Sequence, residues 1–168
     1  MRPVQAVATP TAVISLVISL VLGLSSGTAL ASHYAIADVP RLVTPPQVEK
    51  LRKASVNTTE ELLDKSAKAK DRKALAKASK LTPAELLDLA RRCDLLRIKG
   101  VGSEMVLLFE AAGVKSTSEL VKQEAPGLMT AVTAANKTAK ITEKPPTEPQ
   151  LADWIAQAKK LPQVVEAK

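Results

Sequence analysis

The chain has 168 residues and a formal net charge of +7; hydrophobic residues make up 46% of it, but aromatic residues only 2%. With so few aromatic side chains, the core must be built from Leu, Val, Ile and Ala, and this composition favours helices over sheets. The same shortage excludes a single-strand nucleic-acid binder that stacks bases on an aromatic platform. The positive charge permits a polyanionic or acidic partner without naming one.

The first 31 residues have the pattern of a secretory signal peptide. Arg2 supplies a positive start, an apolar run covers 11–24, and small residues lead to Ala31. We therefore predict cleavage after Ala31 and export to the periplasm or the cell exterior. An uncleaved membrane anchor over 11–31 is the alternative, because about 20 apolar residues can span a bilayer. Residues 32–40 are expected to form a flexible N-terminus.

The rest of the chain repeats itself. Residues 48–62 match 106–120 at an offset of 58, and residues 82–96 match 147–161 at an offset of 65. Such self-similarity is typical of one structural unit used twice. The predicted organisation is a first helical repeat at 41–97, a second at 98–162, and a C-terminal tail at 163–168.

Most polar positions that recur in the two repeats are helix starts. A Ser or Thr followed three residues later by Glu or Gln is a capping box, and such pairs begin at Thr44, Thr58, Thr82, Ser116 and Thr147. Apolar residues behind them recur every three or four positions, which places them on one helix face. We therefore predict an all-α fold of about eight short helices in one compact domain. The helices are expected near 45–54, 59–66, 70–79, 83–94, 103–112, 117–124, 127–137 and 149–160.

A glycine turn, Gly100-Val101-Gly102, joins two of these predicted helices and follows Lys99. Glycine allows a positive φ and leaves the backbone amides uncovered at the start of the next helix. The turn has two interpretations. It is either a compact corner between packed helices, or a phosphate site.

The segment 98–102, an apolar residue and a lysine followed by Gly-Val-Gly, resembles the helix-hairpin-helix motif. With "AAGVKSTSEL" after it, the stretch 38–161 resembles an uncharacterised bacterial family that is built from tandem helix-hairpin-helix-like units and catalogued as a domain of unknown function. The resemblance implies that the amides of Gly100, Val101 and Gly102 hold a backbone phosphate while Lys99 adds charge. Val101 would also fill the space between the two helices.

The first repeat departs from this pattern. Its equivalent turn, 42–45, has the sequence Leu-Val-Thr-Pro, which contains no glycine and ends in a proline without an amide. At most one hairpin is therefore equipped for a phosphate. An exported protein with such a hairpin is also similar in outline to bacterial competence DNA receptors.

A basic stretch covers residues 65–80, in which seven Lys and Arg residues accompany a single acid, Asp71. One interpretation is a polyanion-binding patch, and the other is an ordinary solvated helix face. The candidate contact residues for the patch are Lys68, Arg72, Lys73, Lys77 and Lys80.

The sequence does not assemble a catalytic site. His33 is the only histidine, which excludes Ser-His-Asp, Cys-His and histidine-based metal arrangements. Cys93 is the only cysteine, so no intramolecular disulfide can form, and its place on an apolar helix face predicts a buried structural thiol. We predict no enzyme activity, catalytic residue, metal, cofactor or small-molecule substrate.

Two functions from different classes remain. The first is an exported, non-catalytic module that holds DNA or another polyanion by its backbone without sequence preference. The second is an envelope protein–protein interaction or scaffold module, in which the charges only keep a stable helical body soluble.

Overall fold

A computed structural model describes residues 34–167 of the chain. In this part the fold is all-helical, as predicted, and the only β-type contact is an isolated bridge between Ala35 and Thr58. The predicted signal peptide lies outside the described residues, and no described helix is long and apolar enough to cross a membrane. The helices are the short 3-10 helix η1 (Ile36–Asp38) and α1 (Pro45–Lys53), α2 (Thr59–Ser66), α3 (Ala69–Ser79), α4 (Pro83–Leu95), α5 (Ser103–Ala111), α6 (Thr117–Leu120), α7 (Ala125–Ala139) and α8 (Glu148–Lys160).

The helices begin where the capping boxes predict. The side chains of Thr58 and Thr82 accept from the amides of Glu61 and Glu85, whose carboxylates accept from the threonine amides in return. Gln47 and Gln150 play the reciprocal part at α1 and α8. At α6, Ser116 accepts from the amide of Glu119. These bonds satisfy amides that have no partner within the helix, and each such cap stabilises a helix by about 1 kcal/mol.

Three boundaries differ from the prediction by two residues or more, and one of them is the end of α7, at Ala139 rather than near 137. Helix α6 ends at Leu120 rather than near 124, because Lys122 and Gln123 form tight turns and Glu124 is extended, which redirects the chain. Helix α7 begins at Ala125, two residues early, since Pro126 is tolerated in a first helical turn. It ends where Lys140 adopts a left-handed conformation with φ of 47°.

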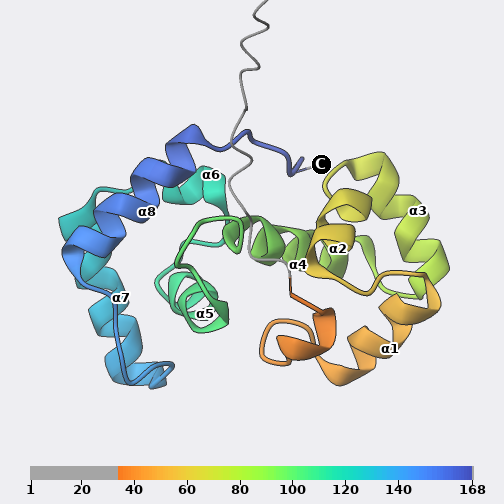
Figure 1. Cartoon of the computed structure of the whole chain (residues 1–168), viewed down its shortest axis with the longest axis horizontal. Coiled ribbons are helices and arrows are strands. Elements are labelled where there is room, and N and C mark those ends of the chain that lie inside the picture. Colours follow the sequence, from red (N-terminus) through yellow and green to blue (C-terminus); the bar gives the residue numbers. More distant parts are fainter. Residues whose placement is uncertain (1–33, 168) are drawn as a thin grey trace, which may run out of the picture.

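The helices form two lobes (Figure 1). The first lobe, residues 34–97, packs α2 and α3 against α4 and α1 against α3; the second, residues 98–161, packs α7 against α5 and α8. Helix α4 also contacts α6 across the boundary, and buried residues from both lobes form one continuous core. Phe109 and Trp154 meet in this core with ring centroids 5.9 Å apart, edge to face.

Helix positions follow the offsets of the sequence repeat. Helix α5 begins and ends 58 residues after α1, and α8 begins and ends 65 residues after α4. The helix-hairpin-helix character of the two units stays a prediction.

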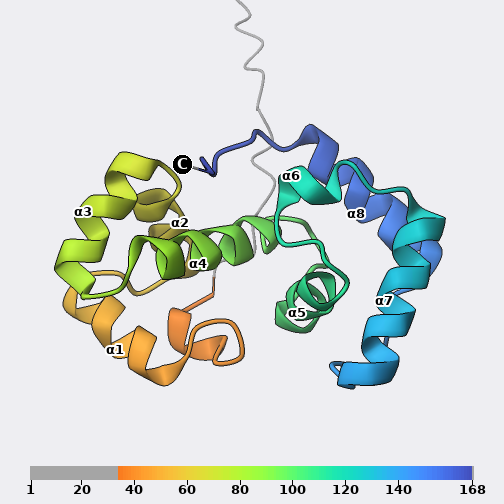
Figure 2. The same cartoon turned by 180° about the vertical axis from the view of Figure 1, so that it is seen from behind.

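The segments before α1 and after α8 pack against the helices where the structure describes them. In the predicted flexible segment 32–40, Ile36 and Val39 are buried, and the amide of Ile36 donates to Asn57 O at 2.9 Å. The segment is held in place by the burial of these apolar side chains, and it is too short for a sequence pattern to predict this. The tail after α8 crosses back to the first lobe, as both views show (Figure 2).

Candidate polyanion-binding surfaces

The glycine turn is a corner packed against α8. Gly100 has a φ of 92°, and a Cβ on it would lie 2.9 Å from Nε1 of Trp154. Val101 is 1% exposed and belongs to the hydrophobic core. Glycine at position 100 is therefore required by the backbone conformation and by the close approach of the indole.

Of the three amides expected to hold a phosphate, that of Val101 is already bonded within the protein, and so is the amide of the preceding Lys99, of which only the side chain was a candidate. The Lys99 amide donates to Oε1 of Gln157 at 2.9 Å, and the Gln157 side chain donates back to Lys99 O. The Val101 amide donates to Ile98 O at 3.0 Å. Gly102 differs from both, since it is the N-cap of α5, no side chain caps this helix, and a Cβ there would meet nothing within 4 Å.

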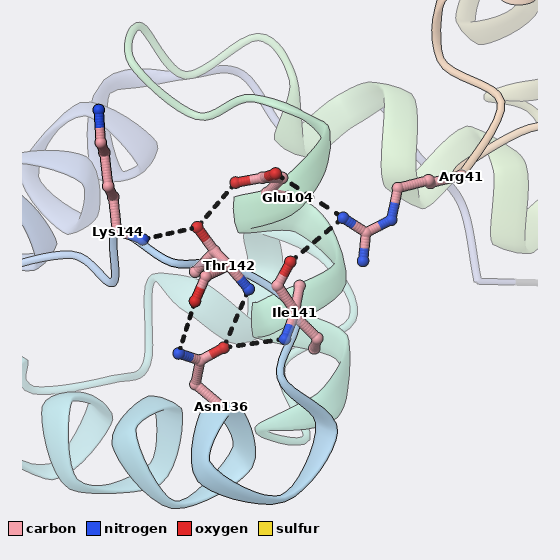
Figure 3. Close-up of polar contacts among 6 residues, drawn as sticks. All are labelled: Arg41, Glu104, Asn136, Ile141, Thr142 and Lys144. Atoms are coloured by element: carbon pink, nitrogen blue, oxygen red, sulfur yellow. Dashed lines mark hydrogen bonds and ion pairs between the residues drawn. The ribbon is translucent and has the colours of Figure 1, made fainter.

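A carboxylate lies in the first turn of α5, beside this open backbone. Glu104 accepts from the Thr142 hydroxyl at 2.7 Å and lies 3.8 Å from Nη1 of Arg41 (Figure 3). Arg41 also donates to Ile141 O, and Asn136 holds the same loop through the amides of Ile141 and Thr142. The negative charge of Glu104 already complements the positive end of α5, so it opposes an approaching phosphate.

The basic helix α3 places its lysines on one solvent face. Leu75 and Ser79 are buried against the first lobe, and three lysines on the opposite side of the helix are exposed. Lys80, the C-cap residue with a left-handed φ of 60°, is exposed as well. Within the described residues none of these four forms an ion pair with a carboxylate. We call this set the α3 lysine row: Lys70, Lys73, Lys77 and Lys80. Lys68, the N-cap residue of α3, is also exposed.

Arg72 does not belong to that face. It is 4% exposed, and its guanidinium donates to the backbone oxygens of Ser66, Ala67 and Glu166 at 2.6–2.8 Å. Burial lowers the pKa of Arg72, Glu166 opposes this effect, and Arg91 adds to it. The guanidinium of Arg72 is therefore not exposed for a direct contact with a polyanion. Its hydrogen bonds instead join α3 to the end of α2 and to the C-terminal tail.

Lys99 and the α3 lysine row lie on different lobes. Lys99 is bonded to α8 through Gln157, whereas α3 lies at the far end of the first lobe in both views (Figures 1 and 2). Lys73 and Lys77 thus lie with Lys70 on one face of α3, Lys68 and Lys80 flank the helix as its N-cap and C-cap residues, and the glycine turn lies apart from all of them (Figures 1 and 2).

A buried acid between the lobes was missed by the sequence analysis. Asp94 is 1% exposed; its Oδ1 lies 2.6 Å from Nη1 of Arg97, and its Oδ2 accepts a hydrogen bond from Thr117. This link ties α4 to α6. No sequence pattern predicts the burial of Asp94, because it follows Cys93 at the edge of the apolar stripe and has no acidic counterpart in the second repeat.

Cys93 is buried, as predicted, and its thiol lies in an apolar environment. Burial, together with the nearby carboxylate of Asp94 and against an opposing effect of Arg92, raises the pKa of Cys93 to about 12. A thiol with so high a pKa carries almost no thiolate at neutral pH, so it is a poor nucleophile. Among residues 34–167 there is also no group of three or more His, Cys, Asp or Glu side chains that could hold a metal ion.

The geometry defines an all-helical domain with one basic helix face and one packed glycine corner. The chain belongs to the family of the domain of unknown function DUF4332, whose model matches residues 41–161. A search of curated proteins and a search of solved structures found no match for this chain.

Proposed function

We propose that this protein is a non-catalytic module that binds the charged backbone of DNA or of another polyanion. The α3 lysine row is the main contact. The single observation that carries the proposal is the exposure of three lysines on one face of α3 and of a fourth at its C-cap, without an acidic partner in the described residues. Such a surface attracts a polyanion at no cost in broken internal ion pairs.

The spacing of the lysine row suits a linear polyanion. Positions 70, 73 and 77 are three and four residues apart, so they lie in one stripe about 10 Å long on α3, and Lys80 follows as the C-cap residue. One strand of duplex DNA presents about three phosphates over the length of that stripe. The aromatic side chains of the described residues are at least partly buried, so base stacking adds little and the binding has no sequence preference.

The glycine turn has at most an auxiliary part in this proposal. Glycine at position 102 meets no requirement of the fold, which leaves its backbone accessible to a ligand. Glu104 and the occupied amides of Lys99 and Val101 weaken the site. We therefore assign the main contact to α3 rather than to the turn.

Binding to a duplex of arbitrary sequence, followed by fluorescence anisotropy at several salt concentrations, tests the proposal. The triple variant Lys70→Gln, Lys73→Gln, Lys77→Gln should lower the affinity and reduce the slope of log K against log salt by about 0.9 per lost contact. The matched control changes three exposed lysines of the second lobe, Lys137, Lys144 and Lys159, to Gln. It removes the same charge, so an equal loss in both variants would assign binding to net charge alone.

Failure of the wild-type protein to bind at about 50 mM salt would end the polyanion proposal, because electrostatic binding is strongest at low salt. A scrambled duplex should bind as tightly as the original one, since the contacts are to phosphates.

We also propose that the protein is exported, on the signal-peptide pattern of residues 1–31. Expression of the full chain in a bacterial host, followed by fractionation and intact mass, tests it. Mature protein that begins at Ser32 supports cleavage. A full-length chain in the membrane fraction supports the anchor instead, and a full-length chain in the cytoplasm contradicts both.

A protein–protein interaction module is the second candidate, and one groove favours it. Between α5 and α7 lies a groove of about 440 Å³ whose described lining consists of six alanines and Thr138, with no charged residue. A partner held there would stay bound at high salt, and Ala134→Glu would release it without changing DNA binding. Retention of the same partner by that variant would exclude the groove as its site.

A further inference from the structure

The C-terminal tail connects the end of the second lobe to the first. After α8 the chain runs past Arg97, which donates to Pro162 O at 3.2 Å, and reaches the loop between α2 and α3 (Figure 1). Val164 and Val165 are half-buried against the core on the way. The tail therefore lies across the lobes rather than extending into solvent.

Glu166 makes the contacts at the end of this path. Its amide donates to Ala67 O at 2.9 Å, its carbonyl accepts from Nη2 of Arg72 at 2.6 Å, and its carboxylate accepts from the Ala69 amide at 2.8 Å. The carboxylate thus caps α3, whose own N-cap residue, Lys68, has no acceptor to offer. Its negative charge therefore lies at the amide of Ala69, the residue between Lys68 and Lys70.

We propose that the C-terminal tail is an autoinhibitory contact: the Glu166 carboxylate competes intramolecularly with the polyanion for the basic surface of α3. The proposal rests on the proposed function, since it concerns the same lysines. A docked Glu166 lowers the positive potential at the start of the α3 lysine row and covers the first turn of the helix. A bound polyanion replaces that one charge by several, so the tail and the polyanion favour different states.

The contacts of the tail are suited to release. Glu166 is exposed, and the valines before it are only half-buried. When the tail leaves, the guanidinium of Arg72 keeps its bonds to Ser66 O and Ala67 O, so α3 stays anchored to the first lobe. Tail release therefore exposes the basic surface without unfolding the helix.

Two variants test the competition by anisotropy with the same duplex. Glu166→Gln weakens the cap and should raise the affinity about two- to five-fold, the effect typical of one charge at a helix end. Glu143→Gln, which removes an exposed acid of the second lobe, is the matched control and should raise it less. Removal of residues 162–168 deletes one Glu and one Lys, so the formal net charge is unchanged and any gain in affinity comes from the location of the charges.

The outcomes separate this proposal from the proposed function. Higher affinity of both the Glu166→Gln and the truncated protein, each with a wild-type circular dichroism spectrum, supports competition. Equal or lower affinity of the folded truncated protein overturns it while leaving the polyanion function intact. Absence of binding by the full chain at low salt overturns the two proposals together.

Discussion

Gly100 lies against the indole of Trp154, so closely that a Cβ on the glycine would come within 2.9 Å of Nε1. The contact joins the glycine turn to α8, so the turn packs directly against the hydrophobic core. It also separates two glycines that look alike in the sequence, because Gly102 has open space around it and an extended backbone that any residue adopts.

Gly100→Ala should destabilise the protein by about 2 kcal/mol or more, because the positive φ strains a side chain and the new Cβ displaces Trp154. Gly102→Ser should be neutral or stabilising, since serine is a good N-cap residue and meets no neighbour. Urea denaturation of the two variants measures both changes. Equal destabilisation would contradict the packing of the turn.

Asp94→Ala should destabilise the protein by about 2–4 kcal/mol, because it leaves Arg97 and the buried hydroxyl of Thr117 without their partner. The control is Asp88→Ala. Asp88 pairs with Arg91 at 3.7 Å, but its carboxylate is 63% exposed, so the loss should be below about 1 kcal/mol. Similar unfolding free energies for the two variants would show that the link between the lobes contributes little.

Acid should weaken two helix caps. The amides of Asn57 and Thr82 donate to Glu61 and Glu85, and these bonds lower the pKa of each carboxyl in the folded protein below its usual value of 4.5. A group with a lowered folded pKa contributes stability that is present above its unfolded pKa and lost as the pH falls through the folded value. Thermal unfolding temperatures should therefore fall as the pH drops below about 4.5.

The control for this pH dependence is the double variant Glu61→Gln, Glu85→Gln. Glutamine preserves the cap, since Gln47 and Gln150 already accept the corresponding amide bonds at α1 and α8. The variant should lose less stability between neutral and acidic pH than the wild type. An unchanged pH profile would assign the acid sensitivity to other carboxyls.

Cys93 should react slowly with thiol reagents in the native protein. It is 5% exposed, and its raised pKa leaves little thiolate at pH values near 8. In denaturant the same thiol should react at the rate of a free cysteine, which an absorbance assay follows directly. Rapid reaction of the native protein would mean that this part of the core opens readily.

Helix positions could be predicted from the sequence because their determinants are local. Thr58 with Glu61, and Thr82 with Glu85, carry the capping information within four residues, and the structure contains both pairs. The boundary between α6 and α7 was predicted less accurately, since the turn between two helices depends on what the second helix packs against.

Contacts between distant residues could not be predicted. In the sequence, Arg72 is indistinguishable from the other basic residues of its stretch. Only the fold buries its guanidinium and brings the backbone oxygen of Glu166 within 2.6 Å of Nη2. Likewise, nothing near Gly100 in the sequence reveals that Gln157 occupies the Lys99 amide. The basic helix could therefore be located from the sequence, but which of its side chains are exposed and which are buried depended on long-range packing.

Trp154 is the only tryptophan of the chain, and it is packed in the second lobe against Phe109 and Gly100. Its emission is consequently a built-in optical reporter of that lobe alone, whereas the ellipticity of the helices sums over both. Because one continuous core spans the boundary, the two signals should change at the same denaturant concentration, and the lobes should unfold as a single cooperative unit.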